Sequence, residues 1–254
     1  MQFETIRYES VPSTMDVARA ADAQGAPEGS VIVADEQTAG RGRGDHTWYS
    51  PPAQSLFLSV ILRPSLAPAK AGWVTMIAAL AVLDTIHESS RIGANEFADI
   101  REDSWMASIK WFNDILLNQR KVCGILVEVS IEGQKLQSMI VGIGLNVNTR
   151  FDAAPPDVQA RATSLACEFG FELDREDVLR RLLAHLGARY EALMQTNASP
   201  AAEYARHLST LGREVRVNAG REIISGRAIR IEDNGALIVQ TSSGERRVGF
   251  GEIY

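Results

Sequence analysis

Residues 107–148 read ASIKWFNDILLNQRKVCGILVEVSIEGQKLQSMIVGIGLNVN. This stretch contains four runs with the texture of strands, at 107–111, 114–118, 121–130 and 135–148. Short polar turns, NQR at 118–120 and EGQ at 132–134, separate the last three runs. Strands joined by such short turns pair antiparallel, so the stretch predicts a meander within a mostly antiparallel sheet.

The flanking segments extend this sheet and add helices. Alternating or compact apolar runs predict further strands at 2–8, 29–37 and 55–62. Helical periodicity, clearest at Trp73, Met76, Ile77, Leu80 and Leu83, predicts helices at 71–89, 177–194 and 201–208, and a capped helix at 13–25. The expected fold class is α+β: a mixed, mostly antiparallel sheet flanked by helices, over residues 1–209.

After Leu211 the helical pattern gives way to short strand-like runs. Four short runs, at 213–220, 222–233, 236–243 and 246–253, are punctuated by the turn sequences AG, DNG and SSG. Such a series predicts a small C-terminal β-barrel over residues 210–254.

Composition excludes several classes of protein. The chain has 254 residues with 26 Lys+Arg against 32 Asp+Glu, a net charge of −6, which argues against a general nucleic-acid or membrane-surface binder. The N-terminus is not a signal peptide, so a cytoplasmic protein without a membrane span is expected. Cys123 and Cys167 lie far apart and are expected to be buried free thiols.

One loop is rich in arginine and glycine although the whole chain has a net negative charge. Residues 38–48 read TAGRGRGDHTW, within a connection of about 18 residues between two predicted strands. Glycines let a backbone approach a ligand closely, and guanidinium groups bind phosphate or carboxylate through forked hydrogen bonds. The simpler alternative is a solvated arginine–glycine loop.

Familiar catalytic motifs are missing from the sequence. It has no P-loop and no G-x-S-x-G elbow, and the G-x-G of VGIGLNVN lacks the third glycine of a dinucleotide fingerprint. The four histidines are scattered, and no metal-ligand spacing is present. Lys110 and Lys121 lie beside polar turns, where each alone indicates no more than a surface lysine, just as Ser13-Thr14 alone indicates a helix cap.

Together, the motifs are more specific. PSTMD, ADEQTAGRGRGDHTWYSP, IKWFNDILLNQRKVCGILVE, GIGLNVN and ATSL occur in the order and spacing typical of biotin protein ligases. The C-terminal LGREVRV, GRAIRIEDNGALIV and GEI resemble that family's SH3-like barrel. The resemblance covers nearly the whole chain and implies the class II synthetase-like ligase fold.

The resemblance implies a role for each motif residue. Biotin would be bound by Ser13, Thr14, Met15, Gln37, Gly40, Arg41, Gly42, Arg43, Lys121 and Gly124. The nucleotide would be bound by Trp48, Lys110, Asn113, Asp114 and Asn146. Lys121, Arg43 and Asp114 would be the catalytic residues, with ATP and Mg²⁺ as cofactors and the metal held mainly by the ATP phosphates rather than by a protein site.

The implied reaction forms biotinyl-5′-AMP and then transfers biotin to a lysine of a biotin carboxyl carrier domain. Because the ligase-type first strand begins near Phe3, a short form without an N-terminal DNA-binding domain is expected, and a homodimer is allowed. The alternatives are a lipoate- or octanoate-attaching ligase, a catalytically weakened biotin-binding relative and a DNA-binding regulator.

Two positions depart from the family pattern. Phe112 stands where relatives have proline in K-W-P-N-D, which predicts a softer or differently shaped turn at Asn113 and Asp114, because proline would fix φ. Gly44 and Asp45 follow the second arginine, where relatives often carry another basic residue, so this loop is less cationic.

Overall fold

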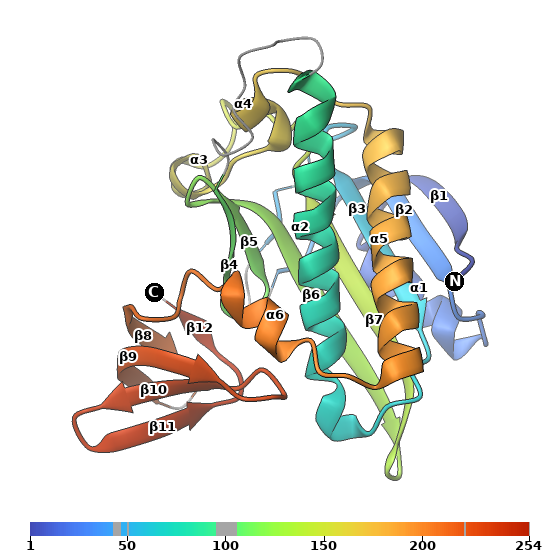
Figure 1. Ribbon diagram of the computed structural model, residues 1–254. Helices are drawn as coiled ribbons and strands as arrows, with labels where there is room; N and C mark the ends of the chain where they lie inside the picture. The colour runs from blue at the N-terminus through green and yellow to red at the C-terminus, as the bar shows by residue number, and fades with distance from the viewer. Residues whose placement is uncertain (43–46, 50, 95–105, 221, 254) are drawn as a thin grey trace.

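The computed structural model describes residues 1–42, 47–49, 51–94, 106–220 and 222–253. Its larger unit is a seven-stranded sheet in the order β1-β2-β3-β7-β6-β5-β4 (Figure 1). The strands are β1 (Glu4–Val11), β2 (Ser30–Gln37), β3 (Leu56–Leu62), β4 (Ala107–Lys110), β5 (Asp114–Leu117), β6 (Arg120–Glu132) and β7 (Lys135–Leu145). β1 and β2 pair parallel and the other neighbours pair antiparallel, so the predicted mixed, mostly antiparallel sheet is confirmed.

The predicted meander is strands β4 to β7. Its hairpins close where Leu117 pairs with Arg120 and where Glu132 pairs with Lys135. The strand predicted to reach residue 148 ends earlier, at Leu145. The backbone N–H of Asn146 still donates to the Val122 carbonyl of β6 at 2.9 Å, but the carbonyls of Asn146 and Val147 accept from Leu165 and Ala166 at 3.0 and 2.8 Å, so the chain leaves the sheet here.

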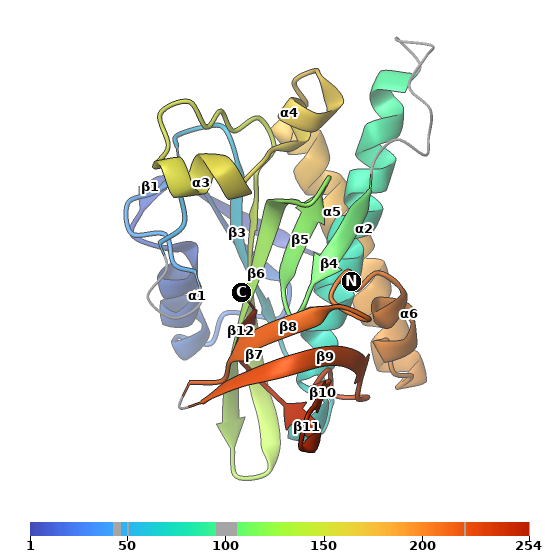
Figure 2. The same ribbon diagram turned by 90° about the vertical axis from the view of Figure 1, so that its left-hand side faces the viewer.

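Helices cover the two faces of this sheet unequally. The long α2 (Gly72–Ala94) and α5 (Arg175–Thr196) pack on one face, and α1 (Thr14–Ala23) packs on the other (Figures 1 and 2). The main core lies under α2 and α5, whereas a smaller cluster lies under α1, around Met15 and Ile61. The face under α1 is therefore only partly covered, which leaves room for a site.

Short helices complete the larger unit. They are η1 (Pro68–Lys70), α3 (Pro156–Arg161), α4 (Leu165–Phe169) and α6 (Ala201–Arg206). The sequence predicts α6 but not the other three, because one or two turns are too short to show apolar periodicity.

Helix α2 is the central core helix. By length and composition alone the segment 68–91 could cross a membrane, but 72% of its most apolar 18-residue window is buried inside the fold. An all-round apolar helix of this kind is explained by its packing between the sheet and α5.

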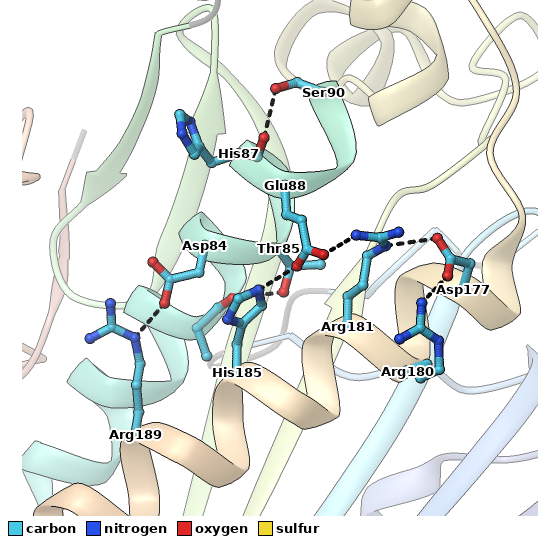
Figure 3. Close-up of polar contacts among 11 residues, drawn as sticks. Asp84, Thr85, His87, Glu88, Ser90, Asp177, Arg180, Arg181, His185 and Arg189 are labelled. Atoms are coloured by element: carbon cyan, nitrogen blue, oxygen red, sulfur yellow. Dashed lines mark hydrogen bonds and ion pairs between the residues drawn. The ribbon is translucent and has the colours of Figure 1, made fainter. Parts of the chain in front are cut away.

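A network of charged side chains joins α2 to α5 along their outer edge (Figure 3). Glu88 of α2 pairs with Arg181 of α5 and with His185 at 2.8 Å. Arg181 also contacts Asp177 at 2.7 Å, and about two turns further along α5 Arg189 contacts Asp84 at 2.6 Å. The hydrogen bond from Arg181, and then that from Arg180, lowers the pKa of Asp177 below its ordinary value of 3.8.

We expect Asp177→Asn to lower the melting temperature at pH 7 by about 2–4 °C, since exposed ion pairs contribute up to about 1 kcal/mol. A carboxyl whose folded pKa is depressed stabilises the fold above its unfolded pKa, and that contribution is lost as pH falls through the folded pKa. The difference between variant and unsubstituted protein should therefore shrink below about pH 4 in thermal melts. A difference that is constant between pH 7 and pH 3 would contradict the ionic origin.

The C-terminal unit is a five-stranded antiparallel sheet in the order β11-β10-β9-β8-β12. Its strands are β8 (Glu214–Asn218), β9 (Ile223–Ile231), β10 (Leu237–Thr241), β11 (Gly244–Val248) and β12 (Glu252–Ile253). The run 246–253, predicted as one strand, is split because the chain turns at Gly251, whose φ of 143° favours glycine. The division of the chain at residues 209 and 210 stays a prediction.

Two indole groups fix this smaller sheet to the larger unit. Trp73 Nε1 donates to the carbonyl of Asp233 at 2.8 Å, and Trp111 Nε1 donates to that of Gly235 at 2.9 Å. Phe112 lies at the same junction, because a Cβ added to Gly235 would meet its ring at 2.7 Å. Tyr204 Oη also donates to the Phe112 carbonyl. Phe112 is thus a packed residue between the two sheets, which the expected softer turn did not anticipate.

The two cysteines differ in environment. Cys123 is buried, as predicted, and burial raises the pKa of its thiol. Cys167 is exposed at α4, so the prediction was wrong for this residue. Its place on a one-turn surface helix cannot be read from the sequence pattern.

Candidate active site

A cavity of about 980 Å³ lies on the α1 face of the large sheet and extends to the edge of the C-terminal sheet. Twelve predicted site residues line it: Ser13, Thr14, Met15, Gln37, Arg41, Trp48, Lys110, Asn113, Asp114, Lys121, Gly124 and Asn146. Gly40 and Gly42 are described but are not lining residues, and Arg43 lies outside the described residues. The structure therefore brings four of the five sequence motifs to one place.

Glycines on two neighbouring strands form the floor of the cavity. Gly124 of β6 pairs with Gly144 of β7, and the indole ring of Trp48 lies on both. An added Cβ would meet that ring at 2.7 Å from Gly124 and at 2.9 Å from Gly144. Gly142, two residues earlier on the same face, makes the same space for Met15, whose Sδ a Cβ would meet at 2.6 Å. Any other residue here would narrow the cavity.

Polar groups gather at the end of the cavity where α1 begins. Thr14 donates to Gln37 Oε1 through both its backbone N–H, at 2.9 Å, and its hydroxyl, at 3.2 Å. Ser59 Oγ in turn donates to Thr14 Oγ1 at 2.9 Å. Because Oε1 accepts these bonds, the amide nitrogen of Gln37 is oriented as a donor. Ser13 is buried at the N-cap position and makes no capping bond with its side chain, so the simple helix-cap reading does not account for it.

Two cations of the cavity, Lys121 and Arg41, are paired with carboxylates. Lys121 Nζ lies 2.7 Å from Asp114 Oδ1 and 5.1 Å from the centre of the Trp48 ring. Arg41 of the loop pairs with Asp16, in the first turn of α1. These contacts hold two positive groups in place for an anionic ligand. The ligand would have to compete with the two carboxylates for them.

Two buried asparagines line another wall of the cavity. Asn113 donates its amide to the carbonyl of Ile125, and Asn146 donates to that of Thr163 at 2.9 Å. Both side chains are buried. These bonds to backbone fix the two amide groups, which is a requirement for a preorganised polar site.

A metal site made by protein alone is not seen in the described parts of the chain, where no group of three or more His, Cys, Asp or Glu could hold an ion. Asp114 nevertheless supplies a carboxylate inside the cavity, beside the amide of Asn113. One carboxylate with phosphate oxygens and water suits Mg²⁺, which seldom uses an all-protein cage. The residues present therefore fit a metal that arrives with a nucleotide.

The sequence did not indicate two walls of the cavity. One is α3 with its neighbours, through Asp157, Arg161 and Phe151, and the other is the edge of the C-terminal sheet, through Asn218 and Glu252. Neither has a motif of its own, and both reach the cavity only through the tertiary fold. The glycine–aromatic sequence GFGE at 249–252 is the nearest signal that could have been used.

Comparison with known proteins gives consistent matches. Residues 8–146 match the Biotin/lipoate A/B protein ligase family, and residues 210–254 match the Biotin protein ligase C terminal domain. The chain is 32% identical to the bifunctional ligase/repressor BirA of Bacillus subtilis, over 98% of this chain and 73% of that protein. It is also 32% identical to the biotin–[acetyl-CoA-carboxylase] ligase of Paracoccus denitrificans, over 88% of this chain and 89% of that protein.

A solved structure extends the match to the whole fold. The biotin protein ligase of Aquifex aeolicus, in complex with biotin and ATP, superposes with a TM-score of 0.80 and 26% identity, over 99% of this chain and 97% of that one. The family resemblance of the motifs is thereby confirmed. The chain belongs to the Biotin/lipoate A/B protein ligase family.

Proposed function

We propose that this chain is an ATP-dependent biotin protein ligase, which forms biotinyl-5′-AMP and transfers biotin to a lysine of a carrier domain. The observation that carries the proposal is a single cavity with a glycine floor, a neutral polar cluster at one end and a lysine–carboxylate pair beyond it. The relatives named as biotin ligases and the match to a structure with biotin and ATP support it.

Biotin fits the α1 end of the cavity. Its ureido ring carries a carbonyl acceptor and two N–H donors, which match the oriented amide of Gln37 and the hydroxyls of Ser13 and Thr14. Gly124 and Gly144 have no side chains, so the Trp48 indole lies directly on the two strands and the cavity keeps depth for the flat bicyclic ring. In this orientation the valeryl carboxylate extends toward Lys121.

The first half-reaction requires charge stabilisation and no general base. An oxygen of the biotin carboxylate attacks the α-phosphorus of ATP, the bond to pyrophosphate breaks, and a mixed anhydride forms. Lys121 offsets the added negative charge, with Arg41 and Arg43 of the loop assisting. When bound, Mg²⁺ would neutralise phosphate charge, with Asp114, Asn113 and Asn146 as the residues that would hold it.

The second half-reaction makes an amide. The ε-amine of a carrier lysine attacks the anhydride carbonyl, the carbon–nitrogen bond forms, and AMP leaves with the electrons of the broken carbon–oxygen bond. Asp114 is the carboxylate placed to orient the amine and accept its proton. The carrier is inferred to be the biotin carboxyl carrier domain of a biotin-dependent carboxylase, and the reaction to take place in the cytoplasm. A homodimer and the absence of DNA binding stay predictions.

Lipoate attachment is the second candidate, because the matched family includes lipoate ligases. The polar cluster around Gln37 favours biotin, since the dithiolane ring of lipoate offers no comparable donors or acceptors. The test is pyrophosphate release from Mg-ATP by the purified protein with biotin, with lipoate or with neither. Release that depends on biotin supports the proposal; release that depends on lipoate, or on neither, contradicts it.

The glycine floor gives a prediction for affinity. We expect Gly144→Ala to weaken biotin binding by roughly tenfold to a hundredfold, because overpacking costs about 1–3 kcal/mol. Isothermal titration with biotin measures it. The matched control is Gly249→Ala, whose added Cβ would meet only the end of Arg247, at 3.6 Å, and which should bind biotin normally. Unchanged affinity in Gly144→Ala would show that biotin binding does not depend on the depth that this floor leaves.

A further inference from the structure

The position of Lys121 depends on a local irregularity of the sheet. Ile115 pairs with Cys123 but Leu116 pairs with Lys121, so Val122 is an extra residue and forms a β-bulge directly after the lysine. Bulges redirect neighbouring side chains and leave backbone groups without their ladder partners. The direction of the Lys121 side chain therefore depends on its backbone. The contacts that hold this backbone determine where the ammonium group lies.

Segment 162–165, the ATSL motif, holds the bulge from outside the sheet. The N–H of Thr163 donates to the Lys121 carbonyl at 2.9 Å, and Ala162 forms a parallel bridge with Lys121. The N–H of Asn146 donates to the Val122 carbonyl at 2.9 Å, and Asn146 is itself held through the Thr163 carbonyl. The ATSL motif is part of the family resemblance, but none of the proposed catalytic steps uses it.

On the other side of Lys121 is a two-residue turn with strained backbone. Asn118 and Gln119 have φ values of 49° and 67°, the left-handed pair required by a tight hairpin between β5 and β6. Asparagine tolerates this conformation, whereas glutamine lacks the freedom of the glycine usually found at the second position. The turn needs contacts from elsewhere to keep this shape.

Glu168 of α4 joins both segments. Its carboxylate accepts from Asn118 Nδ2 at 2.7 Å and from Arg120 Nη2 at 2.5 Å, and also from Thr163 Oγ1. The Glu168 side chain is 7% exposed, so these are shielded, charge-assisted bonds. One carboxylate thus ties the turn that precedes Lys121 to the segment that binds its carbonyl.

We propose that Glu168 is a positioning residue for Lys121: it locks turn 118–120 and the ATSL segment around the bulge, and so fixes the ammonium at the reacting carboxylate and α-phosphate. This inference rests on the proposed function. Glu168 acts through the backbone of Lys121 and touches no substrate.

The test is single-turnover pyrophosphate release by Glu168→Ala. The rate should fall about tenfold to a hundredfold, the effect of a displacement near 1 Å, while biotin affinity stays within about twofold. Glu172→Ala is the matched control, because Glu172 is exposed and pairs with Arg150. Glu168→Gln keeps the side-chain volume, so its release rate should fall less, by about threefold to tenfold. This variant replaces Glu168→Ala in the test if the alanine variant does not fold.

A double-mutant cycle separates positioning from general stability. In a Lys121→Ala background, Glu168→Ala or Glu168→Gln should lower the rate by less than about twofold further, because the group that it positions is gone. Full additivity of the two losses would overturn the proposal. A release rate within about twofold of the unsubstituted protein in folded Glu168→Ala and Glu168→Gln would also overturn it.

A readout without turnover keeps this inference distinct from the proposed function. An amine-reactive ester, followed by peptide mass mapping, gives the labelling rate of Lys121 relative to the strand-end Lys135. With Glu168 removed, Lys121 should leave Asp114 and label several-fold faster relative to Lys135. An unchanged ratio of Lys121 to Lys135 labelling would overturn the positioning role. If labelling changes as expected but the unsubstituted protein releases no pyrophosphate, only the proposed function is contradicted.

Discussion

Lys121→Ala should lower the rate of biotin-dependent pyrophosphate release by about 10²–10³-fold, the range for removing one preorganised charged donor. Lys121 lies in the cavity, 2.7 Å from Asp114 and beside the glycine floor, on a strand whose backbone is held from two sides. Lys121→Arg should restore activity only in part, because a planar guanidinium does not replace a compact ammonium. Single-turnover release, run beside thermal unfolding, is the measurement.

The control for Lys121 is another lysine at a strand end. Lys135 begins β7 and is exposed, so Lys135→Ala should change stability by less than about 0.5 kcal/mol and leave the rate unaltered. A folded Lys121→Ala protein with near-normal release would remove Lys121 from the catalytic group. The alternative of a simple surface lysine would then stand.

Trp111→Ala should lower the free energy of unfolding by about 3–5 kcal/mol, the cost of a large cavity in a core. Its indole is 3% exposed and its Nε1 donates to Gly235 of the C-terminal sheet. The variant removes packing and one of the two indole bonds that fix this sheet. The expected fall in melting temperature is about 10 °C or more for a chain of this size, measured by calorimetry.

Conservative variants divide this effect into packing and hydrogen bonding. Trp111→Phe keeps most of the volume but leaves the Gly235 carbonyl without its donor, which should cost about 1–3 kcal/mol. Trp73→Phe should cost a similar amount, since Trp73 makes the equivalent bond to Asp233. If Trp111→Ala melts within about 2 °C of the unsubstituted protein, the indole bonds do not anchor the C-terminal sheet.

Local sequence determined much of the fold. The strands of the meander and the long α2 and α5 were predicted because their periodicity extends over many residues and agrees with their turns. The short α3 and α4 were missed because they contain too few residues to repeat a pattern. The strand end at Leu145 was missed because it depends on where the backbone finds its hydrogen-bond partners, and the break at Gly251 was missed because it depends on a positive φ that periodicity does not show.

The candidate site was predictable as a set of motifs but not as a geometry. Twelve of the predicted residues line one cavity because their motifs lie at strand ends or turns that the sheet brings together. The partners that orient them are distant in sequence: Gln37 holds Thr14, Asp16 holds Arg41, and Glu168 holds the turn before Lys121. Such pairs carry no local signal, since either residue alone reads as an ordinary polar surface position.

Phe112 shows that a departure from a family pattern can have a tertiary role that the pattern does not indicate. From sequence it predicts a softer turn before Asn113, because the proline is missing. In the structure its ring lies 5.8 Å from that of Trp111 and 6.5 Å from that of Tyr204, at the junction of the two sheets. Packing against a second sheet takes over the restraint that proline would supply, and a pattern of backbone preferences cannot reveal it.

The most direct test of biotin ligation is the mass of a carrier domain after incubation with the purified protein, Mg-ATP and biotin. One biotinyl group per carrier is expected, attached to a single lysine, with AMP and pyrophosphate formed in equal amounts. Lipoate in place of biotin should leave the carrier mass unchanged. A carrier that gains no mass with biotin, or that gains a lipoyl group instead, would contradict the assignment of this chain as a biotin protein ligase.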